Sequence, residues 1–228
     1  MQRILDIFFS ALAMLFLLPP LLPIALLLRL TGEGEIFFVQ ERVGKDGKLF
    51  KLYKFATMLK NSPNIGSGMV TVKNDPRVLS MGRFLRKTKI NELPQLLNIF
   101  LGSMSIVGPR PQAPKNFEAF PKNLQKAIIQ VKPGLSGIGS IIFRGEEDIL
   151  AENEGSLNFY NNVIAPYKGE VESWYVNNQS HLTYFAIISV TVWVIFFPSS
   201  SMAWRVFKDL PSPPDLLKVP LNYPSIDK

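Results

Sequence analysis

The sequence contains no cysteine, which excludes disulfide bonds, thiolate metal ligands and cysteine nucleophiles. Histidine is almost absent, and the single His181 argues against a histidine-based zinc site or a Ser-His-Asp triad. Charged residues make up 19% of the chain, below the roughly 25% that is usual in soluble domains. Any catalysis is therefore expected to use carboxylates, hydroxyls, amides and cations.

Apolar residues and positive charge are what the chain does have. Of its 228 residues 47% are hydrophobic, which excludes a disordered chain. The net charge of +7 indicates an anionic partner, for which nucleic acid, anionic lipid and phosphorylated substrates are the candidates. The basic residues adjoin apolar segments and no nucleic-acid-binding motif is present. We therefore expect a lipid surface or a phosphorylated substrate, and no nucleic acid.

The longest apolar run covers residues 4–30, where Asp6 is the only charged residue before position 29. As one helix it would rise about 40 Å, enough to cross a bilayer. Pro19, Pro20 and Pro23 lie in its middle and predict a break that leaves each half too short to cross alone. Basic residues flank both ends, so the positive-inside rule gives little asymmetry. A re-entrant helix-break-helix with both ends on the cytoplasmic face fits these facts; a kinked transmembrane helix is the alternative.

The middle of the chain has the pattern of a small folded domain. Residues 35–58 alternate short apolar runs around a Gly-Lys-Asp-Gly turn, which predicts a β-hairpin. Residues 82–102 show apolar positions at helical spacing and predict short helices that end near Gly102. The predicted fold class is α+β and mainly helical: a re-entrant N-terminal membrane helix with a small membrane-associated catalytic domain that contains the hairpin.

A second apolar segment covers residues 182–197 and precedes a proline-rich tail. Its length of about 16 residues is slightly short for a span, and its hydroxyl and aromatic side chains suit a helix lying in the headgroup region. A membrane-embedded helix is the alternative. The expected segments are 1–34 for the membrane helix-break-helix, 35–180 for the cytosolic catalytic domain, and 181–228 for the membrane-surface helix and tail.

Glu92 and Arg110 are the first candidates for binding a phosphorylated substrate. Several cations precede Glu92: Arg77, Arg83, Arg86, Lys87 and Lys89. A carboxylate among cations suits a Mg²⁺ ion that grips a pyrophosphate, although Glu92 also fits a helix N-terminus stabilised by the helix dipole. Arg110 lies between two prolines on a stiff extended connection, and its guanidinium group can bind phosphate through paired hydrogen bonds.

The motifs around these residues resemble the bacterial sugar transferase family, the monotopic phosphoglycosyl transferases. The resemblance is carried by Asn-Glu-Leu-Pro-Gln-Leu at 91–96 and Met-Ser-Ile-Val-Gly-Pro-Arg-Pro at 104–111. Further matching motifs are Gln-Glu-Arg-Val-Gly at 40–44, Tyr-Lys-Phe at 53–55 and Lys-Pro-Gly-Leu-Ser-Gly at 132–137. The motifs follow in the family's order, and the resemblance covers about three quarters of the chain.

The resemblance implies an enzyme held against the phospholipids of the bacterial inner (cytoplasmic) membrane, on the cytosolic face, by a re-entrant helix broken at Pro19. Members of the family transfer a sugar-1-phosphate from a UDP-sugar to undecaprenyl phosphate and release UMP. This step begins the assembly of a glycan such as the O-antigen of lipopolysaccharide, capsule or exopolysaccharide. A homo-oligomer stays open, because confinement to a membrane eases self-association.

The resemblance also implies roles for individual residues. In the family scheme an Asp attacks the nucleotide sugar, the adjacent Glu binds Mg²⁺, and arginines hold phosphates. At the matching positions, Glu92 is expected to be catalytic and to bind Mg²⁺, and Arg86 and Arg110 to bind phosphate. Further substrate contacts are expected at Lys54, Thr57, Pro111 and Glu172.

The sequence departs from the family pattern at the nucleophile, where Asn91 stands in place of the usual Asp. A carboxamide is neutral and a poor oxygen nucleophile, so the covalent step does not follow from the resemblance. Four explanations remain open: direct transfer between the substrates, Glu92 as the nucleophile, an engineered or inactivating change at Asn91, and a membrane protein that binds substrate or a partner without catalysis.

Overall fold

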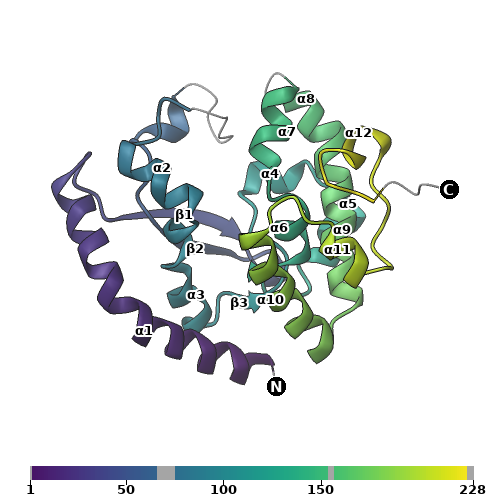
Figure 1. Cartoon of the computed structure of the whole chain (residues 1–228), viewed down its shortest axis with the longest axis horizontal. Helices are drawn as coiled ribbons and strands as arrows, with labels where there is room; N and C mark the ends of the chain where they lie inside the picture. The colour runs from purple at the N-terminus through teal and green to yellow at the C-terminus, as the bar shows by residue number, and fades with distance from the viewer. Residues whose placement is uncertain (1, 66–74, 154–156, 225–228) are drawn as a thin grey trace. The chain divides into compact units, whose positions relative to one another are not determined.

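The computed structural model describes residues 2–65, 75–153 and 157–224, and it is mainly helical (Figure 1). The chain divides into two compact units, each described here by itself. Unit 1 consists of Met1–Arg42 and Leu49–Ser105, and unit 2 consists of Val43–Lys48 and Ile106–Lys228. The segment boundaries predicted at residues 34 and 180 concern contact with a membrane and stay a prediction.

Helix α1 (Gln2–Leu30) dominates unit 1. Within the described part of the chain it is the one helix that is long and apolar enough to cross a membrane, by length and composition. The sequence predicted a break at the three prolines, whereas the structure is helical from end to end. Each proline removes one backbone hydrogen bond and crowds the preceding turn, which bends a helix without necessarily ending it. Figure 1 accordingly shows a helix whose axis curves along its length.

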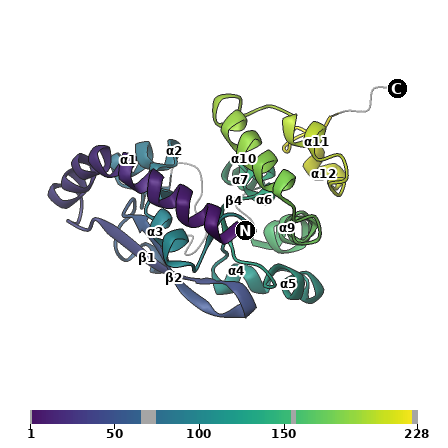
Figure 2. The same cartoon turned by 90° about the horizontal axis from the view of Figure 1, so that it is seen from below.

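The N-terminal end of α1 is fixed to helix α3 (Gln95–Leu101), and the two helices lie side by side in Figures 1 and 2. The Arg3 guanidinium donates to the backbone carbonyls of Ile99 and Phe100 at 2.5 and 2.6 Å. Beyond the end of α3, the hydroxyl of Ser105 donates to the buried carboxylate of Asp6 at 3.0 Å. Arg3 and Asp6, at the start of α1, therefore form hydrogen bonds with other residues of the same unit.

The C-terminal end of α1 packs into an apolar cluster of the same unit. Leu28 is buried against Phe55 and Leu85, which come from the hairpin and from helix α2 (Ser80–Lys87). Partly buried apolar side chains surround these three: Leu21, Ile24, Ala25, Ile36, Met81 and Ile90. Both ends of α1 are thus attached to unit 1.

The predicted β-hairpin is confirmed. Strands β1 (Phe37–Val43) and β2 (Leu49–Phe55) pair in a two-stranded sheet. The turn between them is a single 3₁₀ turn, η1 (Lys45–Gly47), in which Asp46 has the positive φ of 58° that Asp tolerates in tight turns. Asn98 of α3 supports strand β2, because its side chain accepts from the Tyr53 N–H and donates to the Lys51 carbonyl.

The remaining elements of unit 1 are short. A 3₁₀ turn, η2 (Ser62–Asn64), follows the hairpin, and a second one, η3 (Ile90–Glu92), lies between α2 and α3. Helix α3 ends at Gly102, which has a φ of 96°, as the sequence predicted.

A second two-stranded sheet is formed by β3 (Ser105–Val107) and β4 (Gly134–Ser136), and all of it except Ser105 belongs to unit 2. Helix α10 packs against β4, and α6 packs against both α10 and α9 (Figure 2). The helical elements of this unit are α4 (Pro114–Glu118), α5 (Lys122–Ile128), α6 (Ile138–Ile142), α7 (Glu146–Glu152), α8 (Leu157–Phe159), the π-helical η4 (Tyr160–Ile164), α9 (Ala165–Asn177), α10 (His181–Phe196), α11 (Met202–Val206) and α12 (Asp215–Lys218).

Helix α10 is the second apolar segment predicted from the sequence. One face is buried against unit 2, with Tyr184, Ile187 and Val194 among its buried side chains. A hydrogen bond of 2.5 Å between the hydroxyls of Thr191 and Ser136 fixes this face to β4. The other face exposes large apolar side chains: Leu182, Phe185, Val192, Ile195 and Phe196. A helix with one face covered by protein fits the expected surface-lying position; its contact with lipid stays a prediction.

Candidate active site

The candidate catalytic pair lies on the short turn η3 in unit 1. Lys89 precedes this turn in a left-handed backbone conformation, with a φ of 60°, and reverses the chain after α2. The N–H of Glu92 donates to the Lys89 carbonyl at 3.0 Å and closes the turn. Pro94 follows and cannot extend the backbone hydrogen-bond pattern, which separates η3 from α3. Asn91 and Glu92 are both buried on this turn.

The structure brings together Lys54 and Glu92, two of the residues expected at the site. The ammonium nitrogen of Lys54, near the end of β2, lies 3.3 Å from Oε1 of Glu92. Their side chains are only 17% and 12% exposed, so water screens this ion pair weakly. The pair places one cation and one carboxylate where a diphosphate and its counter-ion could meet.

The side chain of Asn91 is also distinctive. Its carbonyl oxygen Oδ1 is buried and has no hydrogen-bond partner among the described residues. A buried acceptor without a partner is costly, and such groups in folded proteins often mark a ligand or ion site. Asn91 therefore offers an oxygen beside Glu92, although its amide lacks the charge of a carboxylate.

These residues fit a magnesium ion held partly by substrate. Carboxylate and amide oxygens are the hard ligands that Mg²⁺ prefers. Within residues 2–65, 75–153 and 157–224, no three His, Cys, Asp or Glu side chains gather closely enough to enclose a metal ion. Mg²⁺ commonly binds through one or two carboxylates and completes its coordination with substrate phosphates and water. Glu92, with Asn91 beside it, matches this arrangement.

Thr57 and Arg86 lie on neighbouring segments of unit 1. The carbonyl of Thr57 accepts from the Leu79 N–H at 3.0 Å, just before α2 begins. Gly82 lets α2 approach this segment, because a Cβ atom at position 82 would collide with the Thr57 backbone. One turn further along α2, the Arg86 guanidinium reaches Met58 Sδ at 3.8 Å. Arg86 on α2 thus lies close to the segment after β2 that contains Thr57.

One cation of the predicted basic group has a structural role instead. Arg77 is 3% exposed, and its guanidinium binds both carboxylate oxygens of Asp75, at 2.8 and 2.5 Å. It also donates to the backbone carbonyls of Ser62 and Ile65. This one side chain thus joins Arg77 to three other residues, Asp75, Ser62 and Ile65. In the sequence, the feature that could have indicated this structural role is an Asp two residues before Arg77.

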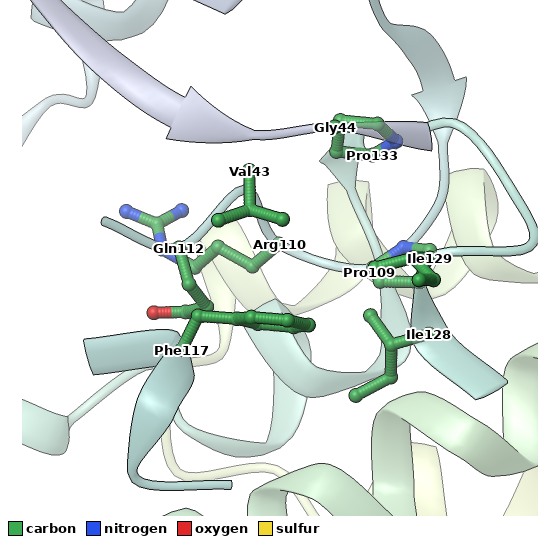
Figure 3. A pocket seen from close by; sticks show the side chains of 9 residues that line it. All are labelled: Val43, Gly44, Pro109, Arg110, Gln112, Phe117, Ile128, Ile129 and Pro133. Carbon is green, nitrogen blue, oxygen red and sulfur yellow. The ribbon is translucent and has the colours of Figure 1, made fainter. Parts of the chain in front are cut away.

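Arg110, Pro111 and Glu172 belong to unit 2, so their placement is described separately from that of Glu92. Arg110 lines a small pocket (Figure 3) whose other lining residues are Val43, Gly44, Pro109, Gln112, Phe117, Ile128, Ile129 and Pro133. In Figure 3 the Phe117 ring and Ile128 point into the pocket, and the Arg110 guanidinium lies on the side away from the two prolines. Pro111 is buried and does not line it.

Glu172 is brought to Arg110 by helix α9. Its side chain is 1% exposed, and its Oε1 accepts a hydrogen bond of 3.0 Å from the backbone N–H of Arg110. Burial raises the pKa of Glu172 to about 7; the N–H groups of Arg110 and Gly139 and the charges of Lys168 and Arg110 offset this only in part. Lys168, on the same helix, is itself paired with Glu146 at 2.5 Å.

This raised pKa predicts a pH dependence of stability. Because the folded protein binds the Glu172 proton more tightly than the unfolded chain does, the stability that Glu172 contributes is fully present below pH 4.5 and is lost as pH rises through about 7. Glu172→Gln removes this titration. Between pH 4.5 and pH 8, the free energy of unfolding should shift in favour of the Gln variant by on the order of 2–3 kcal/mol. Denaturant melts at both pH values measure it, and parallel pH profiles for the two proteins would contradict it.

Comparisons with known proteins identify the family. Residues 1–198 match the family model described as bacterial sugar transferase. The UDP-glucose:undecaprenyl-phosphate glucose-1-phosphate transferase of Escherichia coli (strain K12) is 40% identical over 162 residues, which are 70% of this chain and 35% of that protein. The undecaprenyl-phosphate galactose phosphotransferase of Salmonella typhimurium is 31% identical over 210 residues, 86% of this chain and 40% of that protein.

A third relative, the exopolysaccharide production protein PSS of Rhizobium leguminosarum bv. phaseoli, is 48% identical over 113 residues, 50% of this chain and 56% of that protein. The chain spans about a third of the length of the Escherichia coli relative that it matches. The family match itself covers most of the chain and includes α1, the hairpin and both groups of candidate site residues. The chain belongs to the bacterial sugar transferase family.

Proposed function

We propose that the protein transfers a sugar-1-phosphate from a UDP-sugar to undecaprenyl phosphate, releases UMP and thereby initiates the assembly of a glycan. The family match over residues 1–198 carries this proposal. It is supported by relatives whose names state a sugar-phosphate transfer to undecaprenyl phosphate. The buried Lys54–Glu92 pair supports it too, because it provides a cation for a diphosphate and a carboxylate for Mg²⁺.

We also propose that α1 enters the cytoplasmic face of the inner membrane and returns to it. A helix of 29 residues is about 43 Å long, so a spanning helix would put its two ends on opposite sides of the bilayer. Arg3 and Asp6 at one end and Leu28 at the other are all bound to unit 1. Between them, Leu15 and Phe16 are each 70% exposed and suit contact with phospholipid chains.

The residues of the site have distinct roles in the proposed reaction. Glu92 would hold Mg²⁺, which when bound neutralises charge on the diphosphate. Arg110, in unit 2, is proposed by itself to bind phosphate. Lys54 and Arg86 would bind and orient phosphate oxygens beside Glu92, so that the acceptor phosphate oxygen approaches the sugar-linked phosphorus in line. The new bond joins this oxygen to that phosphorus, the bond to the UMP oxygen breaks, and UMP leaves with the electron pair.

This direct transfer needs no nucleophile from the protein, which is consistent with an amide at Asn91. Intact-mass measurement after incubation with a UDP-sugar should therefore show no added mass on the unaltered protein. The Asn91→Asp variant should gain a phosphosugar adduct, because a carboxylate supplies the nucleophile that the amide lacks. An adduct on the unaltered protein would place the nucleophile elsewhere, with Glu92 as the first candidate, and would contradict direct transfer.

Nucleotide release from a panel of UDP-sugars tests the function itself. UMP should form only when Mg²⁺, undecaprenyl phosphate and the accepted donor are all present. No UMP with any donor would overturn the proposal. That outcome, combined with saturable binding of undecaprenyl phosphate, would support the alternative of a membrane protein that binds substrate or a partner without turnover.

A further inference from the structure

The turn that carries Arg110 has an unusual set of backbone hydrogen bonds. Prolines have no N–H, so Gly108 and Arg110 supply the only backbone donors in the tetrapeptide Gly108–Pro111. The Gly108 N–H donates to the Ser136 carbonyl at 2.9 Å, between β3 and β4. The Arg110 N–H donates to a side chain, Oε1 of Glu172, at 3.0 Å. One carboxyl oxygen therefore holds the backbone at the candidate phosphate-binding residue.

Helix α9 supports the same turn at a second point. The hydroxyl of Tyr175 donates to the carbonyl of Val107 at 3.1 Å. Residues three apart share one face of a helix, so Glu172 and Tyr175 reach the turn together. From the opposite side, the Gly134 N–H donates to the Pro109 carbonyl at 2.8 Å. The backbone on both sides of Arg110 is therefore held by hydrogen bonds.

Glu172 is held in place from the α6 side too. A Cβ atom on Gly139 would collide with the Glu172 carboxylate, so the backbone of α6 lies directly against it. Glu172 is 1% exposed and its second oxygen, Oε2, has no hydrogen-bond partner among the described residues. A side chain so enclosed is poorly placed to touch a substrate.

We propose that Glu172 is a positioning residue: it fixes the Arg110 backbone through the Arg110 N–H and so aims the guanidinium at a substrate phosphate. The aiming part of this inference rests on the proposed function, in which Arg110 binds phosphate. The hydrogen bond needs an acceptor oxygen and no charge, and a protonated carboxyl or an amide supplies the same oxygen. Glutamine should therefore replace Glu172, whereas methionine, of similar size but without this acceptor, should not.

Hydrogen exchange measured by mass spectrometry on a peptide containing residues 108–111 tests the contact without any activity assay. Only two of these residues carry an exchangeable backbone hydrogen, so loss of one protected site is visible. We expect the Arg110 amide to be protected in the unaltered protein and in Glu172→Gln, and to exchange at least about tenfold faster in Glu172→Met. Unchanged exchange in peptides from α5 shows that the variant is folded. Equal protection in the Met variant would overturn the proposal.

Kinetics test the consequence for substrate binding. In Glu172→Met the KM for the UDP-sugar should rise by about tenfold with a smaller change in kcat, and Glu172→Gln should stay within about twofold of the unaltered protein. Glu170→Met, at an exposed carboxylate on the same helix, is the matched control and should change neither value. A Gln variant as impaired as the Met variant would show that the charge of Glu172 is needed, and would overturn a positioning role. If the unaltered protein releases no UMP while the exchange pattern holds, the proposed function fails and the contact with Arg110 stands.

Discussion

Replacing Glu92 by Gln is expected to lower kcat/KM for UMP release by about a thousandfold. The substitution keeps the size of the side chain but removes the charge that would hold Mg²⁺ and that pairs with Lys54 at 3.3 Å. The remaining amide oxygen is a weaker ligand, so the Mg²⁺ concentration needed for half-maximal rate should rise as well. Initial rates over a range of Mg²⁺ concentrations measure both effects.

Glu35→Gln is the matched control for this variant. Glu35 forms an ion pair with Lys60 at 2.9 Å in the same unit, but the two side chains are 47% and 74% exposed. Exposed pairs contribute little, so the rate and its Mg²⁺ dependence should be unchanged. A Glu92→Gln variant that kept its rate within tenfold, with the control also active, would remove Glu92 from the catalytic group.

Replacing Arg77 by Met should destabilise the protein by about 3–5 kcal/mol, because the change leaves the buried Asp75 carboxylate without its cation. The backbone carbonyls of Ser62 and Ile65 lose their donor at the same time. Thermal unfolding in lipid nanodiscs, followed by circular dichroism, should show a much lower midpoint. Any loss of activity at low temperature should follow the folded fraction, since Arg77 has no assigned contact with substrate.

Arg83→Met provides the comparison, because Arg83 is an exposed cation of the same basic group. Its unfolding midpoint should stay close to that of the unaltered protein. An Arg77→Met protein that unfolds like the Arg83 variant would contradict a structural role. It would return Arg77 to the candidates for binding phosphate.

The hairpin and the end of α3 followed from local signals. The Gly-Lys-Asp-Gly turn at 44–47 and the glycine at 102 specify chain reversals by their own conformational preferences. The resemblance to the family named Lys54 and Glu92 as site residues, but local patterns could not predict their contact, because 38 residues separate them. Local patterns specify elements, whereas contacts between elements depend on how those elements pack.

Three features lay outside what the sequence patterns could predict. Prolines predicted a break in α1, but whether a proline ends a helix or bends it depends on the hydrogen bonds that remain around it. The sequence did not distinguish Arg77 from the other cations before Glu92. Its structural role depends partly on the carbonyls of Ser62 and Ile65, which come from a separate segment. The contact between Glu172 and the Arg110 N–H joins residues 62 positions apart.

The fate of the two donor phosphates tests the central claim most directly. With a UDP-sugar labelled separately at either phosphate, the label of the sugar-linked phosphate should enter the organic-solvent-soluble lipid, and the label of the nucleoside-linked phosphate should leave as UMP. This result requires cleavage of the bond between the two phosphates, as sugar-1-phosphate transfer does. Recovery of both labels in soluble UDP, with the sugar alone on the lipid, would contradict it and would make the protein a simple glycosyl transferase.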